Sequence, residues 1–136
     1  MSQYDNEQLK AALATGPIGV EINTSSTAFQ QYSSGIFQCD VELCGNQVDD
    51  LTAFALLVGY GVQDGTEYFI LKNSWGTGWG EAGFMNIISK TGFGESGLNI
   101  HPIVVSTINS SASHASALTS LSFVLAAVAT MTVALF

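Results

Sequence analysis

The spacing of apolar residues at the start of the chain predicts a short helix. Residues 5–14 place Leu9 and Leu13 on one helical stripe, with Asp5 or Asn6 as the N-cap. Gly and Pro follow directly and end the segment. Another helical turn or two is predicted over residues 27–32, where Phe29 and Tyr32 share a side.

Most of the remaining pattern predicts strands. Residues 18–22 alternate between apolar and polar positions, whereas 53–60 is a continuous apolar run, as expected for a buried central strand. The pair Asp64-Gly65 indicates a hairpin turn. The predicted strands, in chain order, are 18–22, 54–60, 67–73, 83–88 and 98–105. Little helix and many strands predict an α+β fold with an antiparallel sheet curling towards a barrel.

The pattern changes after residue 105. Residues 106–117 are small and polar, which is typical of a linker, and residues 118–136 are apolar without any charge. About 19 residues of helix span the hydrocarbon of a bilayer, so a membrane-directed apolar tail helix is predicted. The chain is therefore divided into a folded part over 1–105, a Ser/Ala-rich linker over 106–117 and a tail over 118–136.

Two interpretations of this tail stay open. A tail anchor normally has charged or polar flanks, and nothing basic flanks this one. A glycolipid (GPI) attachment signal has small residues, a polar spacer and an apolar end, with Asn109, Ser110 or Ser111 as the attachment residue. We favour the GPI signal. The first residues contain no apolar h-region, so no cleavable signal peptide is present to match it.

The charge balance excludes several partners. Three lysines, no arginine and eleven acidic residues give a net charge of −8, which argues against binding to nucleic acid or to an anionic membrane surface. The acidic segment 39–50 is interpreted as a solvated loop rather than a calcium site, because its carboxylates do not follow the EF-hand spacing. No metal or cofactor is predicted. Asn23-Thr24-Ser25 is a glycosylation-type triplet.

The segment Tyr68–Gly83 organises the rest of the chain. Four large apolar or aromatic residues give way abruptly to Lys72, Asn73 and Ser74, and Trp75 and Trp79 follow among closely spaced glycines. Glycines let one backbone approach another, and indoles are large, rigid surfaces. A strand that presents an amide to such a loop is suited to holding another group in position.

These motifs resemble the C-terminal half of papain-family cysteine proteases, over about residues 5 to 102. The resemblance rests on an ordered set: Gly16-Pro17, Phe29-Gln30-Gln31-Tyr32, Ser34-Gly35-Ile36-Phe37, Leu57-Val58-Gly59-Tyr60-Gly61, and Tyr68 to Gly76 with Trp79-Gly80-Glu81 and Gly83-Phe84. It implies the barrel-like half of the papain fold.

The family's chemistry uses a thiolate nucleophile, an imidazole beside it, and an amide that orients the imidazole. The resemblance places Asn73 at the orienting Asn and Trp75 at the Trp that shields that hydrogen bond. The histidine position, six residues before the first Gly of Gly59-Tyr60-Gly61, is Ala53. An alternative alignment places Asp50 there, and no histidine precedes His101. His101 and His114 are expected to be surface residues.

The nucleophile and the oxyanion-hole glutamine belong to the family's N-terminal half, which precedes the matched region. The family's later cysteine is replaced by Ser96, so Cys39 and Cys44 are expected to form a local pair or to include a free thiol. A secretory tail without a secretory start suggests an incomplete chain or gene model.

The favoured hypothesis is a papain-type endopeptidase fragment or pseudoprotease that is inactive as this chain. The alternatives are a non-enzymatic, membrane-displayed binding module and one chain of a two-chain peptidase. The expected partners are a peptide or protein substrate once an N-terminal half is present, another chain, and a membrane through the tail. The expected location is the secretory pathway, a lysosome-like compartment or the cell surface. Alone, the chain would expose the apolar face that normally packs on the missing half.

Overall fold

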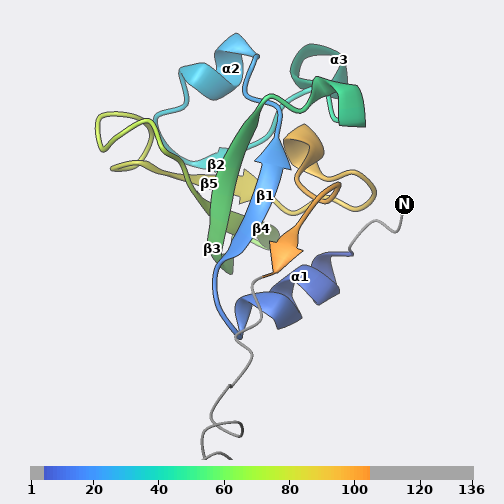
Figure 1. The fold of residues 1–136 in the computed structure, drawn as a ribbon. Coiled ribbons are helices and arrows are strands. Elements are labelled where there is room, and N and C mark those ends of the chain that lie inside the picture. The colour runs from blue at the N-terminus through green and yellow to red at the C-terminus, as the bar shows by residue number, and fades with distance from the viewer. Residues whose placement is uncertain (1–4, 105–136) are drawn as a thin grey trace, which may run out of the picture. The chain divides into compact units, whose positions relative to one another are not determined.

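The computed structural model describes residues 5–104 (Figure 1). Helix α1, Asn6–Leu13, begins at Asp5, whose carboxylate accepts a hydrogen bond from the Gln8 N–H while the Gln8 side chain accepts from the Asp5 N–H. This capping box satisfies two backbone donors that a helix start leaves free. Leu9 is its buried residue, so the predicted helix and its apolar stripe are confirmed.

Six strands form one sheet in the order β2-β5-β4-β3-β1-β6. Their bounds are Ile18–Ile22 for β1, Ile36–Phe37 for β2, Ala53–Gln63 for β3, Thr66–Lys72 for β4, Phe84–Ile88 for β5 and Ile103–Val104 for β6. All neighbours are antiparallel except β2 and β5, which are parallel. The predicted antiparallel barrel is wrong in this respect. The sheet is mixed and open, because its outer strands β2 and β6 are two residues long and pair only inward.

The last predicted strand, residues 98–105, is mostly not a strand. Its first residues instead pack into the core next to the short 3₁₀ turn η2, Glu95–Gly97. Asn99 is fully buried and its amide donates to the carbonyls of Lys90 and Gly92. These bonds hold the segment in a loop, and only Ile103 and Val104 reach β1.

The segment predicted as an acidic loop contains two short helical turns. Helix α3, Val41–Cys44, is capped by Asp40, and the 3₁₀ turn η1 covers Val48–Asp50. Cys39 and Cys44 form a disulfide around α3. Helix α2, Thr27–Gln30, is capped by the Ser26 hydroxyl, which matches the shorter of the two predicted lengths.

The β3–β4 hairpin turns at Asp64 and Gly65, with φ of 51° and 78°. Two successive positive φ values are those of a type I′ turn, so this prediction is confirmed. Strand β3 continues to Gln63, beyond its predicted end, with a register shift between Leu57 and Gly59.

The core lies on one face of the sheet. Ile18, Leu57, Leu71 and Met85 stand opposite one another across β1, β3, β4 and β5, and all four are fully buried. The predicted two-sided burial of 53–60 is wrong, since Phe54 and Leu56 on the other face are 64% and 43% exposed. β3 is interior in the strand order, but within residues 5–104 it is covered on one face only.

The predicted linker, residues 106–117, and the predicted tail helix, residues 118–136, lie outside the described residues. Within residues 5–104, none of the helices has the length and apolar character needed to cross a bilayer.

Candidate functional site

Asn73 follows directly on the last residue of β4 and is buried, with 8% of its surface exposed. Its backbone N–H donates to the carbonyl of Gly83 at 3.0 Å. That bond closes the loop 74–82 at its base and fixes the start of the loop against the start of β5.

The Asn73 side chain is only partly satisfied. Its Oδ1 accepts a hydrogen bond from the Ser74 N–H at 2.8 Å, whereas its buried Nδ2 has no partner within residues 5–104. A buried amide N–H without a partner costs about 1–3 kcal/mol. Residues 5–104 therefore hold the Asn73 amide in place without using its Nδ2 as a hydrogen-bond donor.

Ala53 is the first residue of β3 and is half-buried opposite Ile22 on β1. The pairing of Leu56 with Lys72, extended by one residue, sets Ala55 opposite Asn73. Ala53 lies two residues before Ala55 on the same face, about 7 Å along the strand. The structure thus brings the two predicted positions to one face of neighbouring strands, and a methyl group stands at the histidine position that the resemblance implies.

Asp50, the alternative at that position, lies elsewhere. It is the last residue of η1, and its Oδ2 accepts from the Gln47 N–H at 3.0 Å. Its carboxylate is therefore engaged in a local turn before β3 begins.

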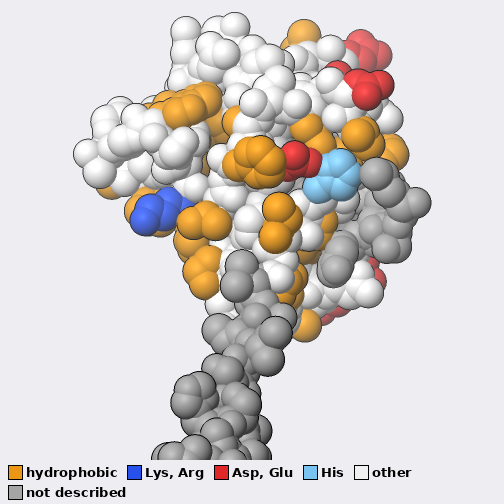
Figure 2. All heavy atoms as spheres, viewed as in Figure 1, with side chains coloured by type: hydrophobic (Ala, Val, Ile, Leu, Met, Phe, Trp, Pro, Cys, Tyr) orange, Lys and Arg blue, Asp and Glu red, His pale blue; other side chains and the backbone are white. Residues whose placement is uncertain are grey.

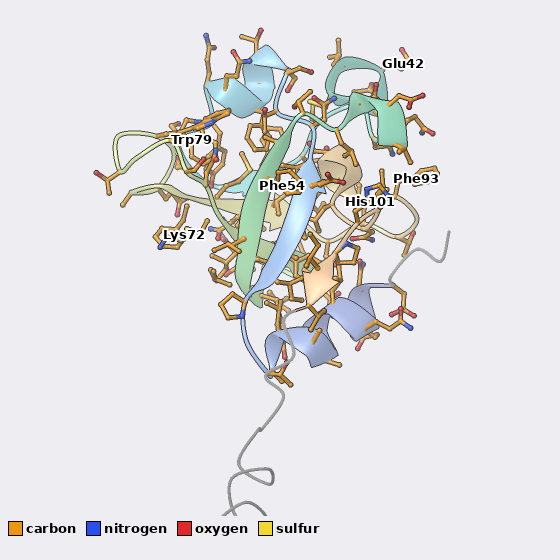
Figure 3. All side chains as sticks on the ribbon, in the orientation of Figure 1. Glu42, Phe54, Lys72, Trp79, Phe93 and His101 are labelled. Atoms are coloured by element: carbon orange, nitrogen blue, oxygen red, sulfur yellow. A yellow bond between two sulfur atoms is a disulfide. The ribbon has the colours of Figure 1, made fainter. Side chains whose placement is uncertain are left out.

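Trp75 and Trp79 form an aromatic group with Phe29 beneath the loop. Trp75 meets both other rings edge to face, at 5.8 Å from Phe29 and 5.3 Å from Trp79. Trp79, labelled in Figure 3, stacks on Phe29 and its indole N–H donates to the Gln30 carbonyl at 3.0 Å. These contacts fix the loop, while Trp75 remains 42% exposed.

Tyr32 and Glu81 tie the loop to the segment before β2. The Tyr32 hydroxyl donates to the Gly35 carbonyl at 2.6 Å and accepts from the Asn86 N–H, and the Glu81 carboxylate accepts from the Gly35 N–H at 2.9 Å. Burial, followed by the nearby Glu81 carboxylate, raises the pKa of the Tyr32 phenol. The Tyr32 hydroxyl also lies 3.1 Å from the Glu81 carboxylate, and the sequence, which offers both residues only as parts of family motifs, did not predict this contact.

The outward face of the sheet has a hollow of about 350 Å³ next to Asn73. Phe54 and Lys72, labelled in Figure 3, are among its lining residues. The complete lining is Gly19, Phe54, Ala55, Leu56, Lys72, Asn73 and Ser74. The sequence did not predict this hollow, because residues 53–57 are all apolar and carry no alternation that would mark an open face.

His101 is half-buried rather than free on the surface. Its Nδ1 lies 2.5 Å from Oε2 of Glu21, and Glu21 is opposite Phe54 in the β1–β3 register. Figure 2 shows the imidazole against a carboxylate and next to hydrophobic side chains. His114, the other histidine, lies outside the described residues.

Both cysteines of the chain are in the Cys39–Cys44 disulfide, so neither is a free thiol here. Within the described part of the chain, no group of three or more His, Cys, Asp or Glu side chains is arranged to hold a metal ion. The acidic segment of the α3 region accordingly shows no such cluster.

A comparison with known protein families shows which family the chain belongs to. A family model described as papain family cysteine protease matches residues 1–106. The chain belongs to the papain family of cysteine proteases. Over 103 residues it is 42% identical to Cysteine proteinase RD21A of Arabidopsis thaliana. This match covers 73% of this chain and 21% of that protein. Cysteine proteinase 1 of Entamoeba histolytica is 46% identical over 88 residues, covering 65% of this chain and 27% of that protein.

Solved structures agree with this assignment. The bromelain protease from Ananas comosus, in complex with the E64 inhibitor, is similar with a TM-score of 0.64 and 30% identity. The match covers 76% of this chain and 47% of bromelain. The proform of the Amb a 11 cysteine protease from ragweed pollen matches with a TM-score of 0.66 over 29% of its length. The chain therefore spans about half of the bromelain chain and 21% and 27% of the two relatives above.

Proposed function

We propose that the chain is the imidazole-side half of a papain-type protease fold from which the imidazole itself is absent, and that it does not hydrolyse peptides. The observation that carries this proposal is an alanine, Ala53, on the same face and about two residues along β3 from a buried Asn73 whose Nδ2 has no partner in residues 5–104. An amide held in this way is suited to orienting a neighbouring ring, and alanine offers no ring to orient.

The chain's own residues support a positioning role. A neutral imidazole at the start of β3 would accept a hydrogen bond from the unpaired side-chain Nδ2–H of Asn73. If the Asn73 amide were rotated by 180°, so that Oδ1 and Nδ2 exchange places, an imidazole N–H would donate to Oδ1. Trp75 stands directly after Asn73-Ser74, where an indole would keep water from such a bond. A methyl group at Ala53 cannot take or give a proton, so general base catalysis by this chain is lost.

The nucleophile is absent as well, because both cysteines are bonded to each other. A disulfide sulfur is not a thiolate, and only the thiolate attacks a carbonyl. In this proposal the remaining half of the papain fold would supply the nucleophile and would cover the outward face that contains Phe54 and Leu56.

The first experiment is a peptidase assay with the purified chain on a fluorogenic peptide mixture, before and after treatment with a thiol alkylator. We expect no hydrolysis above that of buffer. Hydrolysis that the alkylator abolishes would overturn the proposal.

The second experiment supplies the missing parts. A separately produced N-terminal half of a papain-family relative is combined with the parent chain and with its Ala53→His variant. We expect thiol-dependent hydrolysis with the variant only, which would also make a two-chain enzyme feasible for that variant. Activity with the parent chain would show that Ala53 is not the histidine position, and no activity with either would show that more of the site has changed.

A second candidate function is a non-enzymatic binding module, favoured by the open hollow beside Lys72. Its test is retention of purified probes, namely the separate N-terminal half and a set of peptides, on the immobilised chain. If none of them is retained, this candidate is rejected.

The proposal includes a location in the secretory pathway. The Cys39–Cys44 disulfide supports it, because disulfides persist in oxidising compartments. A GPI signal or a tail anchor at residues 118–136 is the finer part of this proposal. Release of the chain from cells by a phosphatidylinositol-specific phospholipase would support the GPI signal, and retention would favour an anchor or no attachment.

A further inference from the structure

One line of residues crosses the outward face of five strands, and we call it the outward row. Strand pairing joins each member to the next, so all members point to the same side of the sheet. In order across β6, β1, β3, β4 and β5, the members are Ile103, Gly19, Leu56, Lys72 and Phe84. The three apolar members are exposed, and so is Phe54, which is two residues before Leu56 on β3.

The outward row is bulky on one side of β3 and has a gap on the other. On the β4 side, Lys72 lies over the ring of Phe84 at 6.0 Å. On the β1 side, Gly19 has no side chain, and it forms part of the 350 Å³ hollow. A long side chain arriving from outside could therefore occupy the space above Gly19.

Charges are also unequal across β3. Of the chain's three lysines, Lys10 pairs with Glu7 and Glu67 and Lys90 pairs with Glu95. Lys72 has no carboxylate within 4.0 Å in the part of the chain that the structure describes.

A carboxylate stands on the other side. Glu21 follows Gly19 by two residues on β1, on the same face, and its bonded partner there is His101. The face thus presents a cation on the β4 side and a carboxylate on the β1 side, with apolar residues between them.

We propose that this face binds a second copy of the chain about a two-fold axis that runs along β3. Rotation about this axis exchanges the β1 and β4 sides of the two copies. Lys72 of the second copy then lies over Gly19 of the first. Glu21 is the next residue of β1 on the same face, about 7 Å along the strand. Phe84 meets Ile103, while Leu56 and Phe54 face their own counterparts.

This arrangement is a self-complementary contact between two aligned sheets. The same patch on both copies makes each Lys72–Glu21 pair twice, as an isologous interface requires. Aligned sheets pack about 10 Å apart with their strands within about 30° of each other, which the open twisted sheet permits. The inference goes beyond the proposed function. The remaining half of a papain fold would take the same face, so it would compete with the second copy.

The test is zero-length carbodiimide crosslinking of the full chain, with equal amounts of ¹⁴N- and ¹⁵N-labelled copies. This reagent joins a lysine to a carboxylate that it touches. We expect Lys72–Glu21 crosslinks in which one peptide is light and the other heavy. The pairs Lys10–Glu67 and Lys90–Glu95 serve as internal controls and should join peptides of the same isotope. Absence of mixed-isotope Lys72–Glu21 links, while the control pairs react, would overturn the proposal.

Charge reversal tests the pairing itself. Sedimentation equilibrium in a mild detergent should show dimerisation weakened at least tenfold by Lys72→Glu or by Glu21→Lys, and restored to within about threefold in the double variant. Glu42→Lys, an exposed change on α3, is the matched control and should have no effect. Since the double variant also loses the Glu21–His101 bond, recovery cannot come from His101. A double variant as weak as the single ones would contradict the proposed contact.

Discussion

At the scale of single residues, the buried side chains of Asn23 and Asn73 differ in how completely they are hydrogen-bonded. Asn23 is fully engaged, because its Nδ2 donates to the Cys44 carbonyl and its Oδ1 accepts from the N–H and hydroxyl of Ser25. Asn73 leaves its Nδ2 without a partner in residues 5–104. The first side chain belongs to the architecture of the fold, and the second is placed as if for another group. The Asn23 side chain of the glycosylation-type triplet is consequently buried and hydrogen-bonded in the folded chain.

This difference predicts unequal costs of truncation. Asn23→Ala should lower the free energy of unfolding by about 2–3 kcal/mol, because it leaves several buried partners unbonded. Asn73→Ala should cost about 1 kcal/mol or less, since it also removes a buried donor that is not satisfied. Urea unfolding of both variants measures the two costs. Equal costs would mean that Asn73 is a structural residue like Asn23.

Tyr32 predicts how stability falls at alkaline pH. Burial raises the pKa of its phenol above the ordinary 10.0, so the folded chain holds this proton more tightly than the unfolded chain. Its contribution is complete below pH 10 and is lost as the pH rises through the raised pKa. Unfolding by urea at several pH values above 10 should therefore show a shallower loss of stability in Tyr32→Phe than in the parent.

The comparison between parent and variant is needed because Lys10 acts in the same direction. Hydrogen bonds to Glu67 and Glu7 raise its pKa to about 12. That contribution is common to both proteins and cancels in their difference. Identical pH slopes for the two proteins would contradict the role assigned to Tyr32.

At the scale of elements, the tryptophan loop depends on backbone geometry that its glycines provide. Gly80 has φ of 57°, and a Cβ placed there would lie 2.5 Å from the Phe84 carbonyl oxygen. Gly78 has a negative or extended φ and open space around it. The same residue type is thus required at one position of the loop and only tolerated at the other.

The corresponding prediction concerns these two glycines. Gly80→Ala should destabilise the chain by about 2 kcal/mol or more, from the left-handed conformation together with the backbone clash. Gly78→Ala should stay within about 0.5 kcal/mol of the parent. Thermal unfolding followed by tryptophan fluorescence gives both values. A similar loss in both variants would show that the loop is not fixed as described.

The disulfide around α3 gives a further prediction at this scale. Cys39 and Cys44 close a short loop, with a sequence separation of 5. Loop-closure entropy for so few residues amounts to about 2 kcal/mol. The double change Cys39→Ser with Cys44→Ser should lower stability by about that amount in urea. A reductant should lower the stability of the parent chain by a similar amount and leave the variant unchanged; a parent chain that does not respond to reductant would contradict a stabilising role for the disulfide.

The sequence pattern predicted elements well where local signals decide them. The cap at Asp5, the alternation over 18–22 and the turn at Asp64-Gly65 each act through neighbouring residues. It failed where distant contacts decide. The apolar residues after η2 predict a strand, whereas Asn99 holds this segment in a loop through the carbonyls of Lys90 and Gly92. Parallel pairing of β2 with β5 also has no local signature.

At the scale of the whole molecule, the predicted site and the unpredicted face belong together. The continuous apolar run at β3 predicts burial on both sides, while in residues 5–104 one side carries exposed Phe54 and Leu56. In the proposed papain-type half, the open side is where the remaining half would pack. Asn73 borders the hollow on this side, whereas Ala53 is not among the residues that line it. The motif order predicted the family, but only the strand register shows which residues share the open face.

We propose that Asn73 and its loop retain the frame for an imidazole, while Ala53 leaves the imidazole absent. The most direct measurement is nitrogen-detected NMR of the histidine side chains in the Ala53→His variant and in the same variant carrying Asn73→Ala. We predict that the introduced ring has one N–H protected from exchange with water, and that this protection disappears when Asn73 is also replaced. An introduced ring that exchanges as fast as a solvated histidine, with or without Asn73, would contradict the account.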